Sequence, residues 1–434
     1  MSEEITQGGF NSVLEEHQKW LNDPDTGERA ILRYKKFNRL NIGCRNLSGA
    51  DFVGSDLTGV ISSTDPANQA NLKDVILKDT ILKNAKLKNV SFLKEEQLSG
   101  ADLTGAELPE NIKFESLEYV NDASKNASRF FIIMLLSCFY SAITILSTTL
   151  PDLITDSETT KLAVINVQVP IVWFYRTAGI YLMGIYIYYH LIMLRLWKVI
   201  ATLPAVFDDG RSLDQRIYPW PVTGIIHHYF KRLEEHSFQP IMWIQLLLTF
   251  ILSWFPVPVV FSCLIWNYIP RHDFYFSIFL ILSLGVTLFF GIYSFSETLI
   301  ILKGEPLLPF KFKEFWSKRD KSNINIKRLH LVNIIFICCF SLIIYIKIGN
   351  NNGDISGENI SKVPDNWNGN MESVKGAKLS GRNLNKIKAQ NVFMVKTDLR
   401  YSSLKEADFS LSKLMSADLR HADLEGAILS AANL

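Results

Sequence analysis

The chain has 434 residues, of which 45 are Lys or Arg and 43 are Asp or Glu, so its formal net charge at pH 7 is only +2. This length leaves room for several domains, and the near-neutral charge excludes a partner recognised by overall charge alone. The five cysteines form no CxxC pair, which predicts small buried thiols and argues against a disulfide framework.

The first 36 residues contain one helical pattern. In SVLEEHQKWL, Ser12 and Glu15 have the spacing of a capping box, and the apolar residues that follow share one face. We expect residues 1–36 to form a capping helix and a linker, with the helix covering the open start of the region that follows. An interfacial membrane helix is the alternative. No basic segment followed by an apolar stretch opens the chain, so no cleaved signal peptide is expected.

Two regions, 37–108 and 374–434, step by five from one mainly apolar residue to the next, and in the second region small residues lie two positions before most of them. In the first region Ser62 and Ala67 interrupt the pattern, which resumes at Leu98 after a shift of one residue. Five is the period of neither a helix nor a strand. A chain that turns a corner every five residues forms a square coil from four repeats, with the large apolar residues pointing inward. Such coils stack through backbone hydrogen bonds at about 4.8 Å. The predicted core residues are Phe52, Leu57, Leu72, Leu77, Leu103, Leu399, Leu404, Phe409, Leu414, Leu419, Leu424 and Leu429.

The pattern A-(D/N)-L-x-x, seen in SADLR, HADLE and SAANL, resembles the pentapeptide-repeat family. The resemblance implies a right-handed quadrilateral β-helix for both regions. It also implies a possible homo-oligomer, because such proteins often dimerise end to end and the pattern stops at Leu434 with no following cap. Some relatives mimic DNA with a strongly acidic surface. Neither region is acidic enough for that role, so no nucleic acid partner is expected.

Long apolar stretches fill the region 109–348 between the repeats. A helix needs about 20 apolar residues to cross the hydrocarbon core of a bilayer. The predicted fold is therefore mixed, with two pentapeptide-repeat right-handed quadrilateral β-helices flanking an α-helical transmembrane bundle, and with a linker at 349–373. The predicted helices are 130–150, 172–198, 241–266, 274–300 and 329–348.

The basic residues beside these stretches predict the orientation. Among the loops between the predicted helices, 195–240 and 303–328 carry most of the Lys and Arg and should be cytoplasmic. The protein is then a multi-pass protein of the cell (inner) membrane with its N-terminus in the cytoplasm. Five spans place the C-terminal repeats on the opposite side. If the stretch interrupted by Pro256 and Pro258 is re-entrant, both ends lie on the same side.

Ionisable residues inside apolar helices are the best candidates for a site. Arg176 and His190 fall on one face of the second predicted span, and Glu297 lies near the inner end of the fourth. Together they form a possible intramembrane functional face or pore lining. The alternative is that Arg176 and Glu297 extend toward opposite interfaces while His190 is packed. Tyr218 and Trp220 should anchor their loop at the membrane interface.

The loop that contains those two aromatics, LPAVFDDGRSLDQRIYPW, resembles a segment of bacterial multi-spanning proteins that also carry pentapeptide repeats. No nucleotide-binding, zinc-protease or hydrolase motif occurs, so no catalytic, cofactor-binding or metal residue is predicted. A metal site at His227, His228 and His236 is the less favoured interpretation of a polar helical stretch.

The sequence thus predicts a non-enzymatic membrane scaffold or sensor that works through protein–protein interaction. Its expected partners are the lipid bilayer and an unidentified protein. The alternative is an oligomeric ion channel or pore-forming effector, for example in stress or phage defence, gated by the repeat domains.

Overall fold

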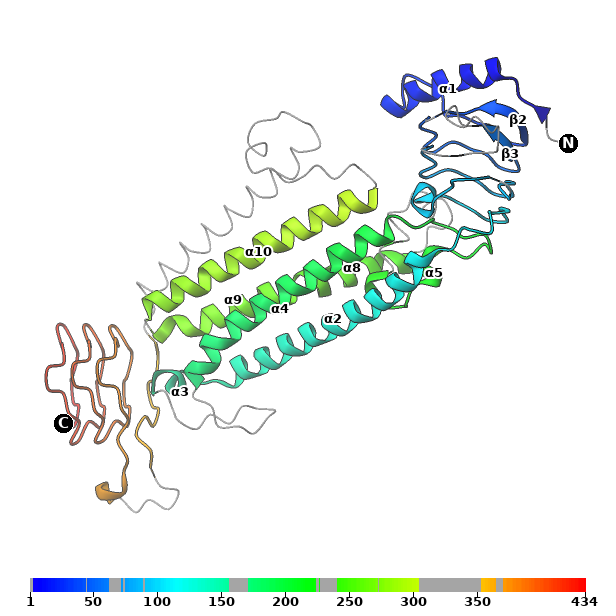
Figure 1. Ribbon diagram of the computed structural model, residues 1–434. Helices are drawn as coiled ribbons and strands as arrows, with labels where there is room; N and C mark the ends of the chain where they lie inside the picture. Colours follow the sequence, from blue (N-terminus) through cyan, green and yellow to red (C-terminus); the bar gives the residue numbers. More distant parts are fainter. Residues whose placement is uncertain are drawn as a thin grey trace. The chain divides into compact units, whose positions relative to one another are not determined.

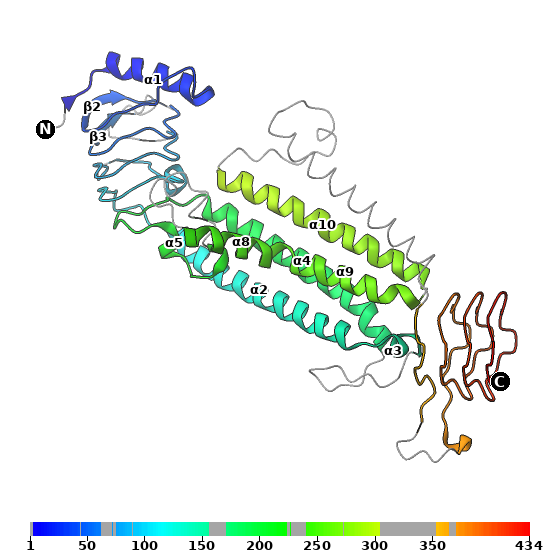
Figure 2. The same ribbon diagram turned by 180° about the vertical axis from the view of Figure 1, so that it is seen from behind.

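The computed structural model separates into two compact units (Figures 1 and 2). The first contains Met1–Phe131, Tyr189–Ser253 and Tyr293–Glu314, and the second contains the remainder. The predicted span 329–348 and the basic loop 303–328 lie outside the described residues, apart from Lys303. The structure describes residues 3–43, 45–61, 72, 75–88, 90–155, 171–223, 226, 240–271, 273–303, 353–363 and 370–434.

The first unit begins with a helix, α1 (Gln7–Asn22), that packs on stacked coils. Thr6 is its N-cap, and the Thr6 hydroxyl oxygen accepts a hydrogen bond from the Gly9 N–H at 3.3 Å. The predicted start at Ser12 is therefore wrong, because Thr6 already caps the free N–H groups of the first turn. The buried residues of α1, Phe10 among them, join the hydrophobic core of the coils.

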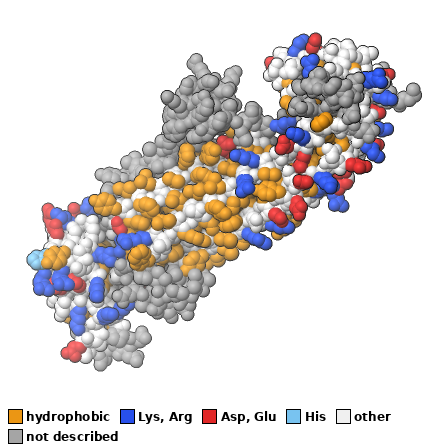
Figure 3. All heavy atoms as spheres, in the orientation of Figure 1, with side chains coloured by type: hydrophobic (Ala, Val, Ile, Leu, Met, Phe, Trp, Pro, Cys, Tyr) orange, Lys and Arg blue, Asp and Glu red, His pale blue; other side chains and the backbone are white. Residues whose placement is uncertain are grey.

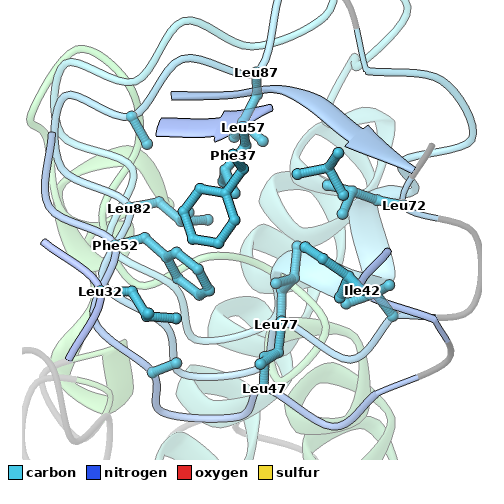
Figure 4. Packing of buried hydrophobic residues seen from close by; sticks show 14 of the residues in the cluster. Leu32, Phe37, Ile42, Leu47, Phe52, Leu57, Leu72, Leu77, Leu82 and Leu87 are labelled. Carbon is cyan, nitrogen blue, oxygen red and sulfur yellow. The ribbon is translucent and has the colours of Figure 1, made fainter. Parts of the chain in front are cut away.

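The N-terminal coils are held together by parallel pairing. Strands β1 (Glu3–Glu4), β2 (Lys35–Asn41) and β3 (Asp56–Ile61) form a small sheet in the order β1-β2-β3. Isolated parallel bridges continue the stack, and a short 3-10 helix, η1 (Glu95–Leu98), follows in the chain. Residues five apart point into one core, as Figure 4 shows. The labelled residues of that core are Leu32, Phe37, Ile42, Leu47, Phe52, Leu57, Leu72, Leu77, Leu82 and Leu87.

Three helices are long and apolar enough to cross a membrane, and a bent pair would make a fourth span, among the described residues. Hydrophobic side chains cover the outer surface of the helices in Figure 3. The long helices are α2 (Glu115–Ser147), α4 (Ile171–Ile200), α8 (Pro240–Trp254), α9 (Pro256–Tyr268) and α10 (Phe274–Lys303). The short ones are α3 (Leu150–Thr155), α5 (Leu213–Arg216), η2 (Pro221–Thr223) and η3 (Ile269–Arg271).

The predicted third span, 241–266, is two helices and not one. The chain leaves the helix at Phe255, between α8 and α9. Pro256 and Pro258 cause the break, because neither has an N–H to donate to the preceding turn and each ring crowds a carbonyl there.

The C-terminal coils are the most regular part of the second unit. Bridges join residues 20 apart, such as Lys378 with Asp398 and Asp398 with Asp418, so four five-residue sides make one coil. Nearly every fifth residue from Lys386 onward has a positive φ, which turns the corner. A short 3-10 helix, η4 (Met371–Ser373), precedes the stack.

Part of the segment predicted as a linker belongs to this stack. Asp354 and Asn359 make parallel bridges with Lys388 and Phe393, so 353–363 supplies an incomplete first coil. At the other end, Leu419, Leu424 and Leu429 are only half-buried, since no described coil covers them. The other predicted core residues are buried: Phe52, Leu57, Leu72, Leu77, Leu103, Leu399, Leu404, Phe409 and Leu414.

Candidate functional site

The segment after α4 forms the last rung of the N-terminal coil stack. We call residues 203–208 the bundle rung, because they belong to the connection between α4 and α8. Val206 makes a parallel bridge with Asp102, and the Leu103 N–H donates to the Val206 carbonyl at 2.9 Å. This rung pairs the free edge of the stack, which would otherwise present bare N–H and C=O groups. Further backbone hydrogen bonds join Gly100 to Leu203, Ala101 to Ala205 and Gly105 to Asp208.

The bundle rung carries a single copy of the five-residue pattern, AVFDD. Ala205 is the small residue and Phe207 the large apolar one two positions later, and both are fully buried. The Phe207 ring meets Phe114 edge-on at 5.1 Å. Arg216 covers the Phe207 ring, with its guanidinium carbon 4.3 Å from the ring centroid. The loop therefore imitates a repeat, a signal that one isolated copy could not reveal in the sequence.

An ion pair fixes the turn that follows the bundle rung. Gly210 has a φ of +79°, which a residue with a side chain adopts at a cost, and Val206 pairs antiparallel with Ser212 across the turn. Arg216 lies 2.6 Å from an Asp209 carboxylate oxygen. The hydrogen bond from Arg216 lowers the pKa of Asp209 below its ordinary value. The turn is thereby held beside the coil edge.

Tyr218 and Trp220 attach the same loop to α2. The Trp220 indole N–H donates to the Ser124 hydroxyl at 2.8 Å, and the backbone N–H of Tyr218 donates to the Asn121 side-chain oxygen at 2.8 Å. Trp220 is buried against Phe131, whereas the Tyr218 side chain is exposed. Their role at a membrane interface stays a prediction.

A second attachment lies in the other unit. Ile154 of α3, in the connection after α2, is buried within the hydrophobic core of the C-terminal coils, and Leu150 packs against that core. The Arg271 guanidinium donates to the Leu153 carbonyl at 2.8 Å, which joins α3 to η3. Each set of coils therefore includes residues from a connection between two apolar helices.

Arg176 pairs with an acid that the sequence had not singled out. Its guanidinium lies 3.6 Å from Asp273, which caps the start of α10 and accepts a hydrogen bond from the Tyr268 hydroxyl at 3.0 Å. Arg176 also lies near the Phe276 ring and remains part-exposed. These residues belong to the second unit, so Asp273, and not Glu297, is the charged partner that the structure assigns to Arg176.

His190 and Glu297 belong to the first unit. His190 is fully buried, and its Nδ1 lies 3.0 Å from the Ser294 hydroxyl of α10. The neighbouring Tyr189 hydroxyl donates to Ser253 of α8 at 3.2 Å. Glu297 is half-buried. His190 thus ties α4 to α10 within a packed core, and its role in an intramembrane functional face stays a prediction.

Two side chains, those of Tyr186 and Trp254, compensate for the helix break at Phe255. The Trp254 carbonyl would normally accept from the residue four positions later, Pro258, which has no N–H. The Tyr186 hydroxyl of α4 donates to that carbonyl at 3.2 Å instead. The Trp254 indole N–H donates to the Gly291 carbonyl of α10 at 3.1 Å. The break is therefore a fixed crossing point where the last residue of α8 meets α4 and α10 within the second unit.

Two buried hydroxyls of α10 bond to carbonyls of their own helix. The Thr287 hydroxyl donates to the Ser283 carbonyl at 2.7 Å, and the Thr298 hydroxyl donates to the Ser294 carbonyl at 2.8 Å, so both protons are used within the helix.

Among the described residues, no group of three His, Cys, Asp or Glu side chains could hold a metal ion. The predicted His cluster at 227, 228 and 236 lies outside those residues.

Comparison with known proteins identifies the coils at one end of the chain. Residues 394–430 match the family model for pentapeptide repeats, with eight copies. Neither the comparison with curated proteins nor that with solved structures gives a match. The matched residues coincide with the regular coils in which bridges join residues 20 apart. The C-terminal coils are therefore built from pentapeptide repeats.

Proposed function

We propose that the chain is an integral membrane protein that acts as a non-enzymatic scaffold or sensor through protein–protein interaction. Both sets of coils are proposed to be right-handed quadrilateral β-helices of the pentapeptide-repeat type. The N-terminal set is included because its buried residues follow the same five-residue step and its bridges are parallel.

One observation carries this proposal: both sets of coils incorporate residues from the connections of the helical bundle. The bundle rung pairs with Asp102 in one unit, and Ile154 enters the coil core in the other. A ligand that shifts either set of coils would therefore act directly on segments that begin or end apolar helices. That is the mechanical link that a membrane sensor needs, and it requires no catalytic residue.

The proposed location is the cell (inner) membrane of a bacterium, with the N-terminus in the cytoplasm and the C-terminal repeats on the other side. The basic loops 195–240 and 303–328 support this orientation. Reporter domains fused before Met1 and after Leu434 test it. The proposal expects opposite compartments, and the same compartment for both reporters would contradict it.

An oligomeric ion channel is the second candidate, because His190 and Ser294 are polar groups buried together between α4 and α10. The two functions differ in liposomes. A scaffold gives no ion flux and a native mass that includes a second protein when it is purified from its own membranes. Ion flux that disappears in His190→Ala but persists in Tyr188→Ala, an exposed neighbour on α4, would establish the channel and overturn the scaffold.

A further inference from the structure

The positive charge of the C-terminal coils is concentrated in one coil. Residues 374–397, which we call the basic coil, contain no Asp or Glu, whereas 398–434 contain more acidic than basic residues. Figure 3 shows Lys and Arg side chains gathered over these coils. The basic residues of the basic coil are Lys375, Lys378, Arg382, Lys386, Lys388 and Lys396.

The basic coil is also the complete coil that lies nearest to the helices of the second unit. A side chain added at Gly353 would contact Leu150, Pro270 and Ile387 within 4.0 Å, so the coil residue Ile387 lies close to the first residue of α3 and to the middle residue of η3. Ile154 of α3 enters the same core. The charge is therefore at the end of the coil stack where the apolar helices begin and end.

Part of this charge is compensated within the protein. Lys386 forms an ion pair with Glu406 at 3.7 Å. Hydrogen bonds from Ser356, and then the charge of Lys388, lower the pKa of the Asp354 carboxyl. Lys375 and Lys378 are exposed, and neither makes an ion pair with another described residue. The segment around Lys375 and Lys378 thus keeps a net positive charge that no ion pair with a described residue compensates.

We propose that the basic coil binds the anionic phospholipid headgroups of the bilayer that holds the apolar helices. Lys and Arg side chains near an anionic bilayer surface are attracted to it within about one Debye length, and the basic coil lies beside α3 and η3. The contact would hold the C-terminal coils against the membrane. This inference rests on the membrane location proposed above.

Hydrogen exchange of the full-length protein in nanodiscs tests the inference. The protein is placed in discs of phosphatidylcholine alone and in discs that also contain phosphatidylglycerol. Backbone amides of residues 374–397 should exchange at least about fivefold more slowly in the anionic discs. Raising the salt from about 0.1 M to about 1 M shortens the Debye length from about 10 Å to about 3 Å and should remove the difference.

Two charge-matched variants make the test specific. The first removes three charges from the basic coil, and the second removes three from the coils farther along the chain. Slower exchange in anionic discs should be lost in the first variant and retained in the second. The inference would be overturned if residues 374–397 of the unmodified protein exchanged equally fast in both kinds of disc, or if both variants changed that exchange equally. Whether the protein enters the discs at all tests the membrane location separately. The variants are Lys375→Gln/Lys378→Gln/Arg382→Gln and Arg400→Gln/Lys405→Gln/Lys413→Gln.

Discussion

The backbone N–H of Leu103 donates a hydrogen bond to the carbonyl of Val206 at 2.9 Å, although the whole of α2, α3 and α4 separates the two residues in the chain. This bond places a connection between two apolar helices inside the N-terminal coil stack. As a result, both ends of the N-terminal coil stack are covered by other segments of the chain. α1 packs on the first coil, and the bundle rung pairs with the last.

Phe207→Ala should release the bundle rung. Phe207 is fully buried between Phe114 and Arg216, and removing a buried phenyl ring costs about 3–5 kcal/mol. Trypsin should then cleave after Arg211 and Arg216 faster than in the unmodified protein. Phe92→Ala is the control, because the Phe92 side chain is 59% exposed. Unchanged cleavage in Phe207→Ala would show that the ring does not hold the rung.

Leu404→Asp should unfold the C-terminal coils, because it buries an unpaired carboxylate in their core, where water cannot solvate it. The same change at Leu419 should be milder, since Leu419 is only half-buried. Limited proteolysis followed by intact mass measurement ranks the two. Leu411→Asp is the control at an exposed corner with positive φ, a conformation that Asp tolerates. If Leu404→Asp were as protease-resistant as Leu411→Asp, the inward assignment of the five-residue step would be wrong.

These coils were predictable from sequence because each repeat carries its own signal. The step of five recurs many times, and chance cannot maintain it from Leu399 to Leu429. The bundle rung was not predictable, because its pairing with Asp102 joins distant segments and AVFDD occurs once. The partner of Arg176 was also missed, since Asp273 lies between two apolar helices and only their packing brings the two charges together.

Acidification should loosen α1. The Ala30 N–H donates to Nδ1 of the buried His17 at 3.2 Å. Burial, and then the charge of Arg29, lower the pKa of His17 below its ordinary 6.5. The unfolded segment therefore takes up a proton below pH 6.5 while the folded one does not, so stability is full above that pH and falls below it.

The pH effect is measured as protease resistance of α1 between pH 7.5 and 5.5. His17→Asn keeps an acceptor near the position of Nδ1 but cannot titrate in this range, so its resistance should not vary with pH. His421→Asn, at an exposed histidine of the C-terminal coils, should behave like the unmodified protein. A pH dependence that persists in His17→Asn would assign the effect to another group.

Gly291→Ala should destabilise the crossing point of the helices, because an added Cβ would overlap the Tyr186 hydroxyl. Combining it with Tyr186→Phe should restore part of the loss, since the overlapping oxygen is then absent. Tyr186→Phe alone should cost about 1–3 kcal/mol, the range for leaving a buried carbonyl unpaired. Thermal unfolding in detergent measures all three variants. Gly184→Ala is the control, because the added Cβ meets nothing within 4 Å. If the effects of Gly291→Ala and Tyr186→Phe on stability simply added in the double variant, the overlap would be contradicted.

Hydrogen exchange at single backbone amides of the unmodified protein tests directly whether the bundle rung belongs to the N-terminal coil stack. The Leu103 amide should exchange as slowly as the Leu82 amide, which donates to Asp102 of the next coil at 2.8 Å, because the bundle rung supplies an equivalent acceptor. The Leu419 amide, at the same place in a C-terminal repeat, has no backbone acceptor among the described residues and should exchange much faster. If Leu103 exchanged as fast as Leu419, the bundle rung would not be part of the coil stack, and the proposed mechanical link between the coils and the apolar helices would be wrong.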